Sequence, residues 1–308
     1  MNVITLPGLI DIHVHLRDPG QTEKEDFSTG TLAALAGGFT TVCDMPNNKL
    51  PIFTYERLQE KLKLAKKTAH CKVLFYFGTL GDNLVEFEKV YPYVAGLKIY
   101  LDKTTGGFIL NSDRLLTVFE AWKSKKPILL HCENEHLYTL INVVRKTRKK
   151  THICHIHSKY ILETLIKAKK EGLPITCGIT PHHLFLTRKD EKALGPFGMM
   201  KPSLPSKEDN AFFWKNLDYI NVVESDHAPH TIAEKQSDKP PFGVPGLETT
   251  LPLLLDAVNK KRISIKDVIR LCYDNPRKIP NLQESKDRII VDMDKEYTIN
   301  GIGIENKM

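Results

Sequence analysis

The segment Leu9-Ile-Asp-Ile-His-Val-His-Leu16, followed directly by Arg17, says most about the fold. It is a short apolar run of the kind that forms a strand buried in a parallel sheet. His13 and His15 lie two residues apart, so a regular strand points both imidazoles to one face. A doubly wound nucleotide-binding sheet would normally carry a glycine-rich turn after its first strand. The ending His-Val-His-Leu-Arg therefore favours a different parallel α/β fold.

Seven further short apolar runs follow, and most of them are separated by amphipathic helical patterns. Together with the first run, strands are predicted at 9–16, 40–46, 73–79, 95–101, 128–133, 152–158, 175–181 and 220–226. Helices are predicted at 55–67, 113–125, 135–149 and 159–171, with start signals at Asn111-Ser112-Asp113 and a stop signal at Gly172. Eight strands with intervening helices predict an α/β fold, the (β/α)8 TIM barrel.

Length and composition agree with one large domain. The 308 residues are 41% apolar and 26% charged, which excludes collagen-like, disordered and coiled-coil chains. Length alone allows two medium domains or one α/β barrel of about 250 residues. The strand pattern favours a barrel at 1–280 and a C-terminal tail with short strands at 281–308. A Pro- and Gly-rich loop at 231–246 interrupts the repeat, and loops of that length are often functional.

Charge and cysteine usage narrow the class of protein. No apolar run approaches the roughly 18 residues of a membrane span, and no secretory signal is recognisable. The six cysteines are scattered without a CxxC pair, so we expect a cytoplasmic protein with no membrane partner. The net charge is +7, with basic residues concentrated at 61–67 and 145–150. Both stretches lie in helical patterns without interleaved aromatic residues, so we interpret them as solvated helix faces and expect no nucleic-acid partner.

Histidines gather at one end of the predicted barrel. Nine of the 12 lie at or just after the carboxyl ends of predicted strands: His13, His15, His131, His155, His157, His182, His183, His227 and His230. Active sites of such barrels form at this end. For His13 and His15 alone, a hydrogen-bonded core pair is an equal alternative to a metal site. With His131 and His155, three strand ends supply imidazoles, which favours a metal site.

Other polar residues lie at the same end. Asp226 ends the eighth predicted strand, where its carboxylate could ligate metal or take a proton, with a turn cap as the alternative. Lys98 interrupts an apolar strand, which is costly unless the lysine is paired or chemically altered; a buried ion pair and a Schiff base are both alternatives. Arg17 follows the histidine pair and could hold a carboxylate with two hydrogen bonds, and Asn47 ends the second predicted strand; for each, a surface or turn residue is an equal alternative. Cys154 is interpreted as a core residue facing away from His155.

Eight stretches, taken together, carry a family resemblance. They are Pro7-Gly-Leu-Ile-Asp-Ile-His-Val-His-Leu-Arg-Asp-Pro-Gly20, Lys24-Glu-Asp-Phe27, Met45-Pro-Asn47, Gly96-Leu-Lys98, His152-Ile-Cys-His155, Pro181-His-His-Leu-Phe-Leu186, Ser225-Asp-His-Ala-Pro-His230 and Gly246-Leu-Glu-Thr249. The chain resembles the dihydroorotases of the amidohydrolase superfamily, and looks most like the dihydroorotase domain of the animal multifunctional pyrimidine-synthesis protein. The first stretch and the Ser-Asp-His-Ala-Pro-His motif are highly specific in combination.

The resemblance implies a metal-dependent amidohydrolase barrel with a reduced C-terminal β-sandwich remnant. It implies two zinc ions per chain, one held by His13, His15 and Asp226, the other by His131 and His155. Lys98 would be carboxylated by carbon dioxide and would bridge both ions. A water activated by the ions would attack the ring amide carbonyl of dihydroorotate, and Asp226 would carry its proton to the leaving nitrogen.

The activity so implied is the reversible cyclisation of N-carbamoyl-L-aspartate to L-dihydroorotate plus water, in de novo pyrimidine (UMP) biosynthesis. One alternative is a related cyclic amidohydrolase, such as a dihydropyrimidinase, hydantoinase or allantoinase. Another is a non-catalytic pathway scaffold, whose signature of substituted ligand residues is not seen. The sequence does not give the oligomeric state; by family analogy we expect a homodimer, with other pyrimidine-pathway enzymes as further partners.

The resemblance also assigns substrate contacts. The substrate α-carboxylate would be held by Arg17, Asn47 and His230. Thr104 matches a threonine in the family's mobile loop, here 102–108, and Lys201 stands where the animal domain has an arginine.

Two departures from the animal domain stand out. Thr105 replaces a phenylalanine of the mobile loop. Gly178 replaces a glutamate that belongs to a third zinc site. The second departure argues against a third zinc here, although Cys154 is retained.

Overall fold

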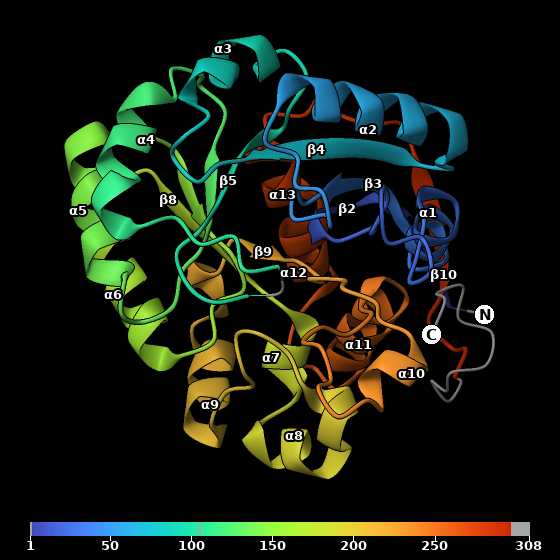
Figure 1. Ribbon diagram of the computed structural model, residues 1–308. Helices are drawn as coiled ribbons and strands as arrows, with labels where there is room; N and C mark the ends of the chain where they lie inside the picture. The colour runs from blue at the N-terminus through green and yellow to red at the C-terminus, as the bar shows by residue number, and fades with distance from the viewer. Residues whose placement is uncertain (1, 105, 297–308) are drawn as a thin grey trace.

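The computed structural model describes residues 2–104 and 106–296 and contains an eight-stranded parallel barrel. Each strand pairs with the next along the chain, in the order β2 (Leu9–Val14), β3 (Phe39–Asp44), β4 (Lys72–Gly78), β5 (Gly96–Tyr100), β6 (Ile128–His131), β7 (Thr151–Ile153), β8 (Ile175–Ile179) and β9 (Val222–Val223). The barrel closes where Val14 bridges His227 and the His15 amide donates to the His227 carbonyl at 2.8 Å. This arrangement confirms the predicted (β/α)8 barrel (Figure 1).

Helices surround the barrel, as Figure 1 shows. They are α1 (Phe27–Ala36), α2 (Tyr55–Thr68), α3 (Phe87–Val90), α4 (Leu115–Ala121), α5 (Leu137–Thr147), α6 (Lys159–Lys170), α7 (Pro181–Phe185), α8 (Arg188–Leu194), α9 (Lys207–Lys215), α10 (Ile232–Lys235), α11 (Leu247–Asn259), α12 (Ile265–Ile269) and α13 (Asn275–Lys278). Side-chain caps fix several starts: Asp26 forms a capping box with Thr29, and Ser158 accepts from the Ile161 amide. The predicted start at Asn111 is confirmed by its bond from the Asp113 amide.

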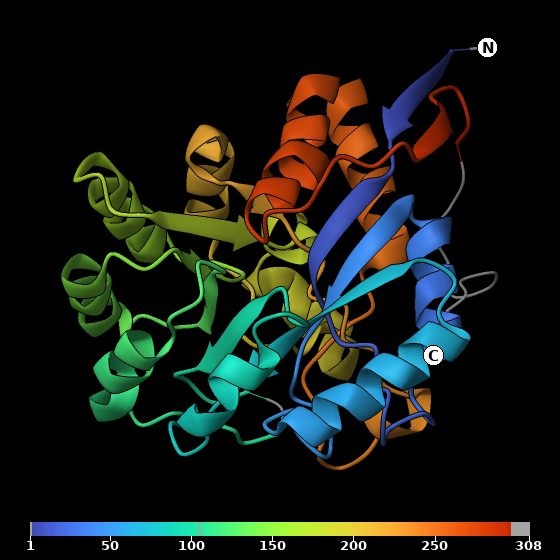
Figure 2. The same cartoon turned by 90° about the horizontal axis from the view of Figure 1, so that it is seen from above.

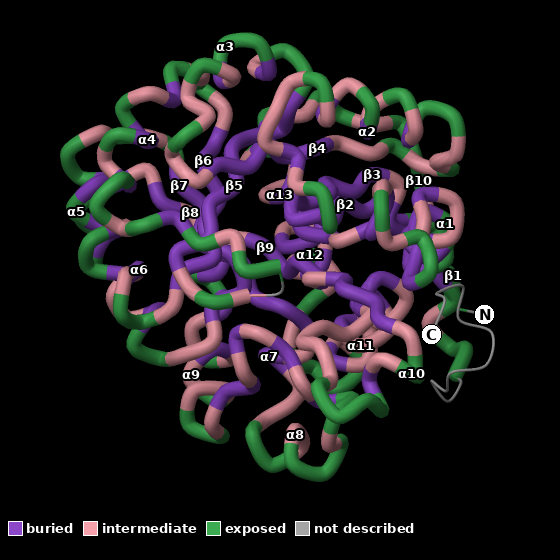
Figure 3. The backbone as a smooth tube through the Cα atoms, in the orientation of Figure 1, coloured by how far each residue is buried: buried purple, intermediate pink, exposed green. Residues whose placement is uncertain are grey.

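The core has two parts. A large apolar cluster fills the space between strands and helices and includes the fully buried Phe119 and Trp122. A smaller cluster lies inside the barrel and includes Ile12, Tyr76 and Leu129. Figure 3 shows the buried strands at the centre and the exposed helix surfaces at the periphery. The interior is therefore packed, which leaves the strand ends as the place for polar chemistry.

The predicted strands extend too far at their carboxyl ends. The predicted strand 152–158 corresponds to β7, which ends at Ile153, and 220–226 corresponds to β9, which ends at Val223. Beyond these points the chain leaves the sheet: His155 and Asp226 have φ values of 36° and 48°, in the left-handed region. Arg17 shares this conformation at 62°. Backbone strain of this kind concentrates at functional sites.

A small antiparallel sheet joins the two ends of the described chain. β1 (Val3–Pro7) pairs with β10 (Arg288–Asp292), and Figure 2 shows the two strands side by side at one edge of the molecule. The expected sandwich remnant is therefore present, although one of its strands comes from the N-terminus and not from the C-terminal tail. We retain the division at residue 280 as a proposal; residues 297–308 of the predicted tail lie outside the described residues.

One surface prediction is wrong. Lys61, at the start of the basic stretch 61–67, is 1% exposed. Its Nζ lies 2.7 Å from a carboxylate oxygen of Asp44 and donates to Asn48 Oδ1 at 2.7 Å. The amphipathic pattern of α2 could not show that one lysine turns inward to meet a carboxylate from β3.

No helix of the described residues is long and apolar enough to cross a bilayer.

Candidate active site

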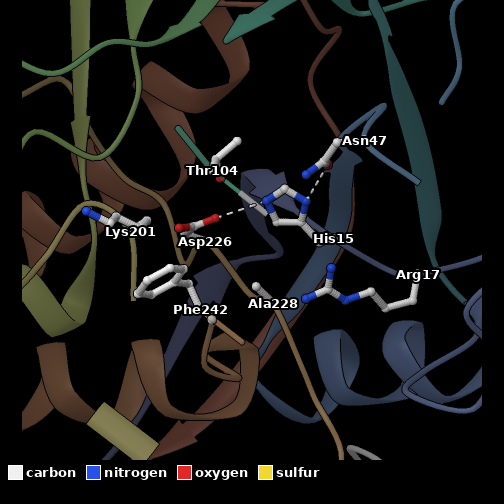
Figure 4. Close-up of a pocket in the computed structure, with 9 residues that line it drawn as sticks. His15, Arg17, Asn47, Thr104, Lys201, Asp226, Ala228 and Phe242 are labelled. Carbon is white, nitrogen blue, oxygen red and sulfur yellow. Dashed lines mark hydrogen bonds and ion pairs between the residues drawn. The ribbon is translucent and has the colours of Figure 1, made fainter. Parts of the chain in front are cut away.

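The carboxyl ends of the barrel strands surround a polar cavity. It is lined by His15, Arg17, Asn47, Thr104, Lys201, Asp226, Ala228, Phe242 and Gly243. Six of these are residues singled out from the sequence. In Figure 4 the side chains of Arg17 and Lys201 lie on opposite sides of the central His15–Asp226 pair. The cavity thus has a cation at each side and a carboxylate in the middle.

The His13–His15 pair converges on Asp226. His13 Nε2 and His15 Nε2 lie 3.2 Å and 3.1 Å from Asp226 Oδ1. His15 Nδ1 lies 2.8 Å from the amide oxygen of Asn47, and an oxygen only accepts, so the His15 proton is on Nδ1. The lone pair of His15 Nε2 then faces a carboxylate oxygen. Two acceptors this close fit a shared cation, and two imidazoles with a carboxylate are a donor set that zinc prefers.

His131 and His155 extend this group. His131 Nδ1 lies 3.1 Å from His155 Nε2, so one of these two nitrogens carries a proton unless a metal takes its place. His131 Nε2 and His155 Nδ1 are buried and have no hydrogen-bond partner among the described residues. Ligand atoms of His13, His155 and Asp226 all lie within 4.8 Å of one another. The structure therefore brings all five predicted histidine and aspartate ligands together.

Electrostatics keeps these groups in the right protonation state for metal binding. Burial lowers the pKa of His13 to about 4, and it also lowers the pKa values of His15 and His155. The imidazoles are therefore neutral at pH 7 and keep a lone pair for a ligand. Burial alone would raise the pKa of Asp226, but the neighbouring His13 and His15 outweigh it and lower that pKa. Asp226 is therefore ionised.

Lys98 lies on β5 with no exposed surface, next to this group. Its Nζ lies 3.1 Å from Cys154 Sγ and 4.9 Å from the centre of the Tyr100 ring. Within residues 2–104 and 106–296, no carboxylate forms an ion pair with it. A buried ion pair, one of the alternatives, is thus not seen, and an uncompensated buried ammonium is costly. Conversion of the amine to an anionic carbamate would remove that cost.

The orientation predicted for Cys154 is wrong. Cys154 is buried, as expected, but its sulfur points toward Lys98 on the same side as His155. The prediction assumed a regular strand, whereas β7 has already ended and His155 is in the left-handed region.

Two of the three residues predicted for the substrate carboxylate, Arg17 and Asn47, line the cavity, and the third, His230, contacts Arg17. Arg17 Nε donates to the Pro229 carbonyl at 3.1 Å, which directs the guanidinium toward His230, whose Nε2 lies 3.2 Å from Arg17 Nη2. Asn47 follows β3 and is held through His15. A guanidinium and an amide at one wall suit an anionic oxygen ligand.

Thr104 and Lys201 line the other parts of the cavity. Lys201 Nζ lies 5.6 Å from the centre of the Phe242 ring. The loop carrying Thr104 is anchored where Asp102 Oδ1 meets His136 Nδ1 at 2.9 Å. Thr105 lies outside the described residues.

Several supporting residues were not predicted. Phe242 and Gly243 come from the loop 231–246, whose length was the only signal. Glu224 is fully buried and lies between the end of β9 and Asp226. Its Oε2 is 3.2 Å from His152 Nε2 and 3.8 Å from His13 Nδ1. With His13 and Cys154 it forms a second group of close ligand atoms. The Glu224 carboxylate lies beside Gly178, so Gly178 alone does not exclude a further ion.

Comparison with known proteins agrees with the geometry. A sequence model described as the amidohydrolase family matches residues 4–176. The chain is 42% identical over 300 residues to multifunctional protein CAD of Squalus acanthias, covering 96% of this chain but only 13% of that protein. It is 36% identical over 319 residues to a dihydroorotase of Pyrococcus furiosus, covering 99% of this chain and 75% of that protein.

Solved structures share the fold. L-hydantoinase from Arthrobacter aurescens superposes with a TM-score of 0.93 at 23% identity, covering 99% of this chain and 80% of the other. An inactive dihydroorotase-like domain of a Chaetomium thermophilum CAD-like multifunctional protein gives 0.85 at 24% identity, covering 98% and 88%. At these identities the likeness concerns the fold alone. From the matched family region and the Pyrococcus relative, this chain belongs to the amidohydrolase family and, within it, to the dihydroorotases.

Proposed function

We propose that this chain catalyses the zinc-dependent, reversible cyclisation of N-carbamoyl-L-aspartate to L-dihydroorotate plus water. The observation that carries the proposal is the pairing of two groups in one cavity. A cluster of histidines around Asp226 lies beside a wall formed by Arg17 and Asn47, with His230 in contact with Arg17. The first group suits a metal-dependent hydrolase, and the second suits a substrate that carries a carboxylate next to its reacting amide.

Two zinc ions would be held by the predicted ligands. The set comprises His13, His15, Asp226, His131, His155 and a carbamate formed when Lys98 Nζ adds to carbon dioxide and loses a proton. When bound, the ions make a water nucleophilic near neutral pH and polarise the amide carbonyl. We propose two ions and not three, because the oxygens of Glu224 already accept from the His155 amide and contact His152.

Residues of the chain itself would bind the substrate and transfer the proton. Arg17 and the neighbouring side chains would bind the substrate carboxylate and so orient the ring amide toward Asp226. In ring opening, water adds to the carbonyl carbon and the ring carbon–nitrogen bond breaks. Asp226, ionised in the resting site, would accept the proton of that water and deliver it to the leaving nitrogen. Cyclisation runs the same steps in reverse.

The alternatives are weaker on specific grounds. A related cyclic amidohydrolase would share the histidine cluster, but most such substrates lack the carboxylate that Arg17 is placed to bind. A non-catalytic scaffold would be expected to lose ligand residues, whereas every predicted ligand is present and converges.

The direct test is an assay of purified protein in both directions across pH, with zinc analysis of the same sample. The proposal expects cyclisation at acidic pH and ring opening at alkaline pH, because cyclisation consumes a proton when the substrate carboxylate is ionised. It also expects activity to disappear on chelation and to return with zinc. A metal-free protein with full activity would refute it.

A further inference from the structure

We propose that Lys24 is a positioning residue that selects the tautomer of His230 with the proton on Nε2, so that Arg17 does not donate to His230 and keeps its guanidinium available to a carboxylate. Lys24 lies just before α1, in the stretch Lys24-Glu-Asp-Phe27 that has no part in the function proposed above. The tautomer follows from geometry alone. Its consequence for substrate binding rests on the proposed function.

The two neighbours of His230 Nε2 favour different tautomers. The Phe242 carbonyl oxygen lies 3.0 Å away and can only accept, whereas Arg17 Nη2 lies 3.2 Å away and can only donate. A protonated Nε2 donates its one proton to Phe242 and cannot accept from Arg17, so the Nη2 protons of Arg17 remain available for the oxygens of a carboxylate. A bare Nε2 would accept from Arg17 and occupy one donor of the guanidinium. Only the first tautomer leaves Nη2 of Arg17 available to a carboxylate.

The surroundings of Nδ1 decide between the two. Lys24 Nζ, a donor, and Glu234 Oε2, an acceptor, both lie 3.4 Å from this nitrogen. Lys24 also forms an ion pair with Glu234 Oε1 at 2.8 Å, and Glu234 Oε2 accepts from the Thr231 amide at 3.2 Å. Lys24 keeps further protons after pairing with Glu234, and its contact with Nδ1 has hydrogen-bond geometry, whereas the Glu234 oxygen lies near Nδ1 without forming a hydrogen bond. That leaves the proton on Nε2.

Burial and nearby positive charges keep His230 neutral, so the position of its single proton describes its state. Lys24 and His230 are 7% and 4% exposed. Burial, together with Arg17 and Lys24, lowers the pKa of His230 to about 3, although Glu234 opposes the shift. His230 is consequently neutral at pH 7, and either ring nitrogen could carry its one proton. Without Lys24, the Glu234 carboxylate would attract that proton to Nδ1.

Histidine tautomers can be read directly by long-range proton–nitrogen NMR of protein labelled with ¹⁵N-histidine. The His230 signals are identified by their loss in His230→Gln. The proposal expects the Nε2–H tautomer in the wild-type protein at pH 7. The Nδ1–H form in the wild-type protein would overturn it without any variant being needed.

Variants then test the role of Lys24. Lys24→Met should move the proton to Nδ1, and Lys24→Met with Glu234→Gln should return it to Nε2, since the competing carboxylate is gone. Lys61→Met is the matched control, because Lys61 is an equally buried lysine whose Nζ meets a carboxylate and no imidazole. An unchanged His230 tautomer in folded Lys24→Met would refute the proposal.

Kinetics adds a second readout. Lys24→Met should raise the KM for dihydroorotate about tenfold, the size expected for one charge-assisted hydrogen bond, with kcat within about twofold. Zinc content should be unchanged, and Lys24→Arg should recover most of the loss. A fall in kcat and zinc content without a rise in KM would indicate a merely structural role and would contradict the proposal. If the wild-type protein does not turn over dihydroorotate, the proposed function fails, but the NMR result still decides the tautomer.

Discussion

The carboxylate of Glu224 occupies the space into which a side chain at Gly178 would project. A Cβ placed on Gly178 would lie 2.4 Å from both Cδ and Oε1 of Glu224. Glu224 is fully buried and bonded to His152 and to the His155 amide, so it cannot yield without breaking contacts. We therefore predict that Gly178→Ala lowers the free energy of unfolding by about 1–3 kcal/mol, the usual range for overpacking. Urea denaturation measures this change.

A double-mutant cycle tests whether Glu224 is the cause. In a Glu224→Ala background the space is vacant, so the same Gly178→Ala change should cost markedly less. Equal costs in the two backgrounds would show that the contact with Glu224 is not what excludes a side chain at position 178.

Lys98→Ala is predicted to remove zinc and activity together. The lysine is buried next to the histidine cluster, and its carbamate would contribute ligand oxygens to both ions. Outer partners of metal ligands alone are worth about 10–100-fold in metal affinity, so loss of a bridging ligand should exceed about a hundredfold. Zinc analysis and turnover of the same sample measure both effects.

The control for this variant is Lys260→Ala, directly after α11. That lysine is exposed and pairs with Asp256 in the last turn of the helix, so its removal should leave zinc and turnover as they were. Full zinc content in Lys98→Ala would rule out the bridging role.

Asp226→Asn is predicted to reduce kcat by about 10²–10⁴-fold, the usual contribution of a positioned general base. The amide cannot accept the proton that the carboxylate, 3.1 Å from His15 Nε2, is placed to take. Steady-state kinetics in both directions measures the loss. Near-normal turnover would remove Asp226 from proton transfer.

Arg17→Met is predicted to reduce kcat/KM for dihydroorotate by about 10–100-fold, because one charge-assisted interaction with the substrate carboxylate is lost. Dihydrouracil has the same ring without the carboxylate, so any residual turnover of it should be little affected. An equal loss for both rings would mean that Arg17 supports the site only structurally.

Local patterns account for what the sequence could predict. Short apolar runs show where a chain is buried as strands, and polar residues just after them mark the rim of a parallel barrel. The sequence therefore predicts that His13, His15, His131 and His155 lie together, and Asp226 with them. Arg17 and Asn47 were located by the same rule.

Contacts between segments distant in the sequence account for the features that could not be predicted. The sequence around Lys61 does not show that its side chain forms a buried ion pair with Asp44. Likewise, the sequence around Val3 does not show that its strand pairs with the strand at 288–292. The side chain of Cys154 points inward because β7 ends at Ile153 and His155 adopts a left-handed conformation. These features are set by packing between elements, which periodicity does not record.

The most direct test of the central claim is a comparison of kcat/KM for ring opening of dihydroorotate, dihydrouracil, hydantoin and allantoin by the zinc-loaded protein. The cavity wall of Arg17 and Asn47, with His230 in contact with Arg17, predicts turnover of dihydroorotate about 10–100-fold above the others, the value of one charge-assisted contact to the carboxylate. Equal or greater turnover of a ring without a carboxylate would contradict it.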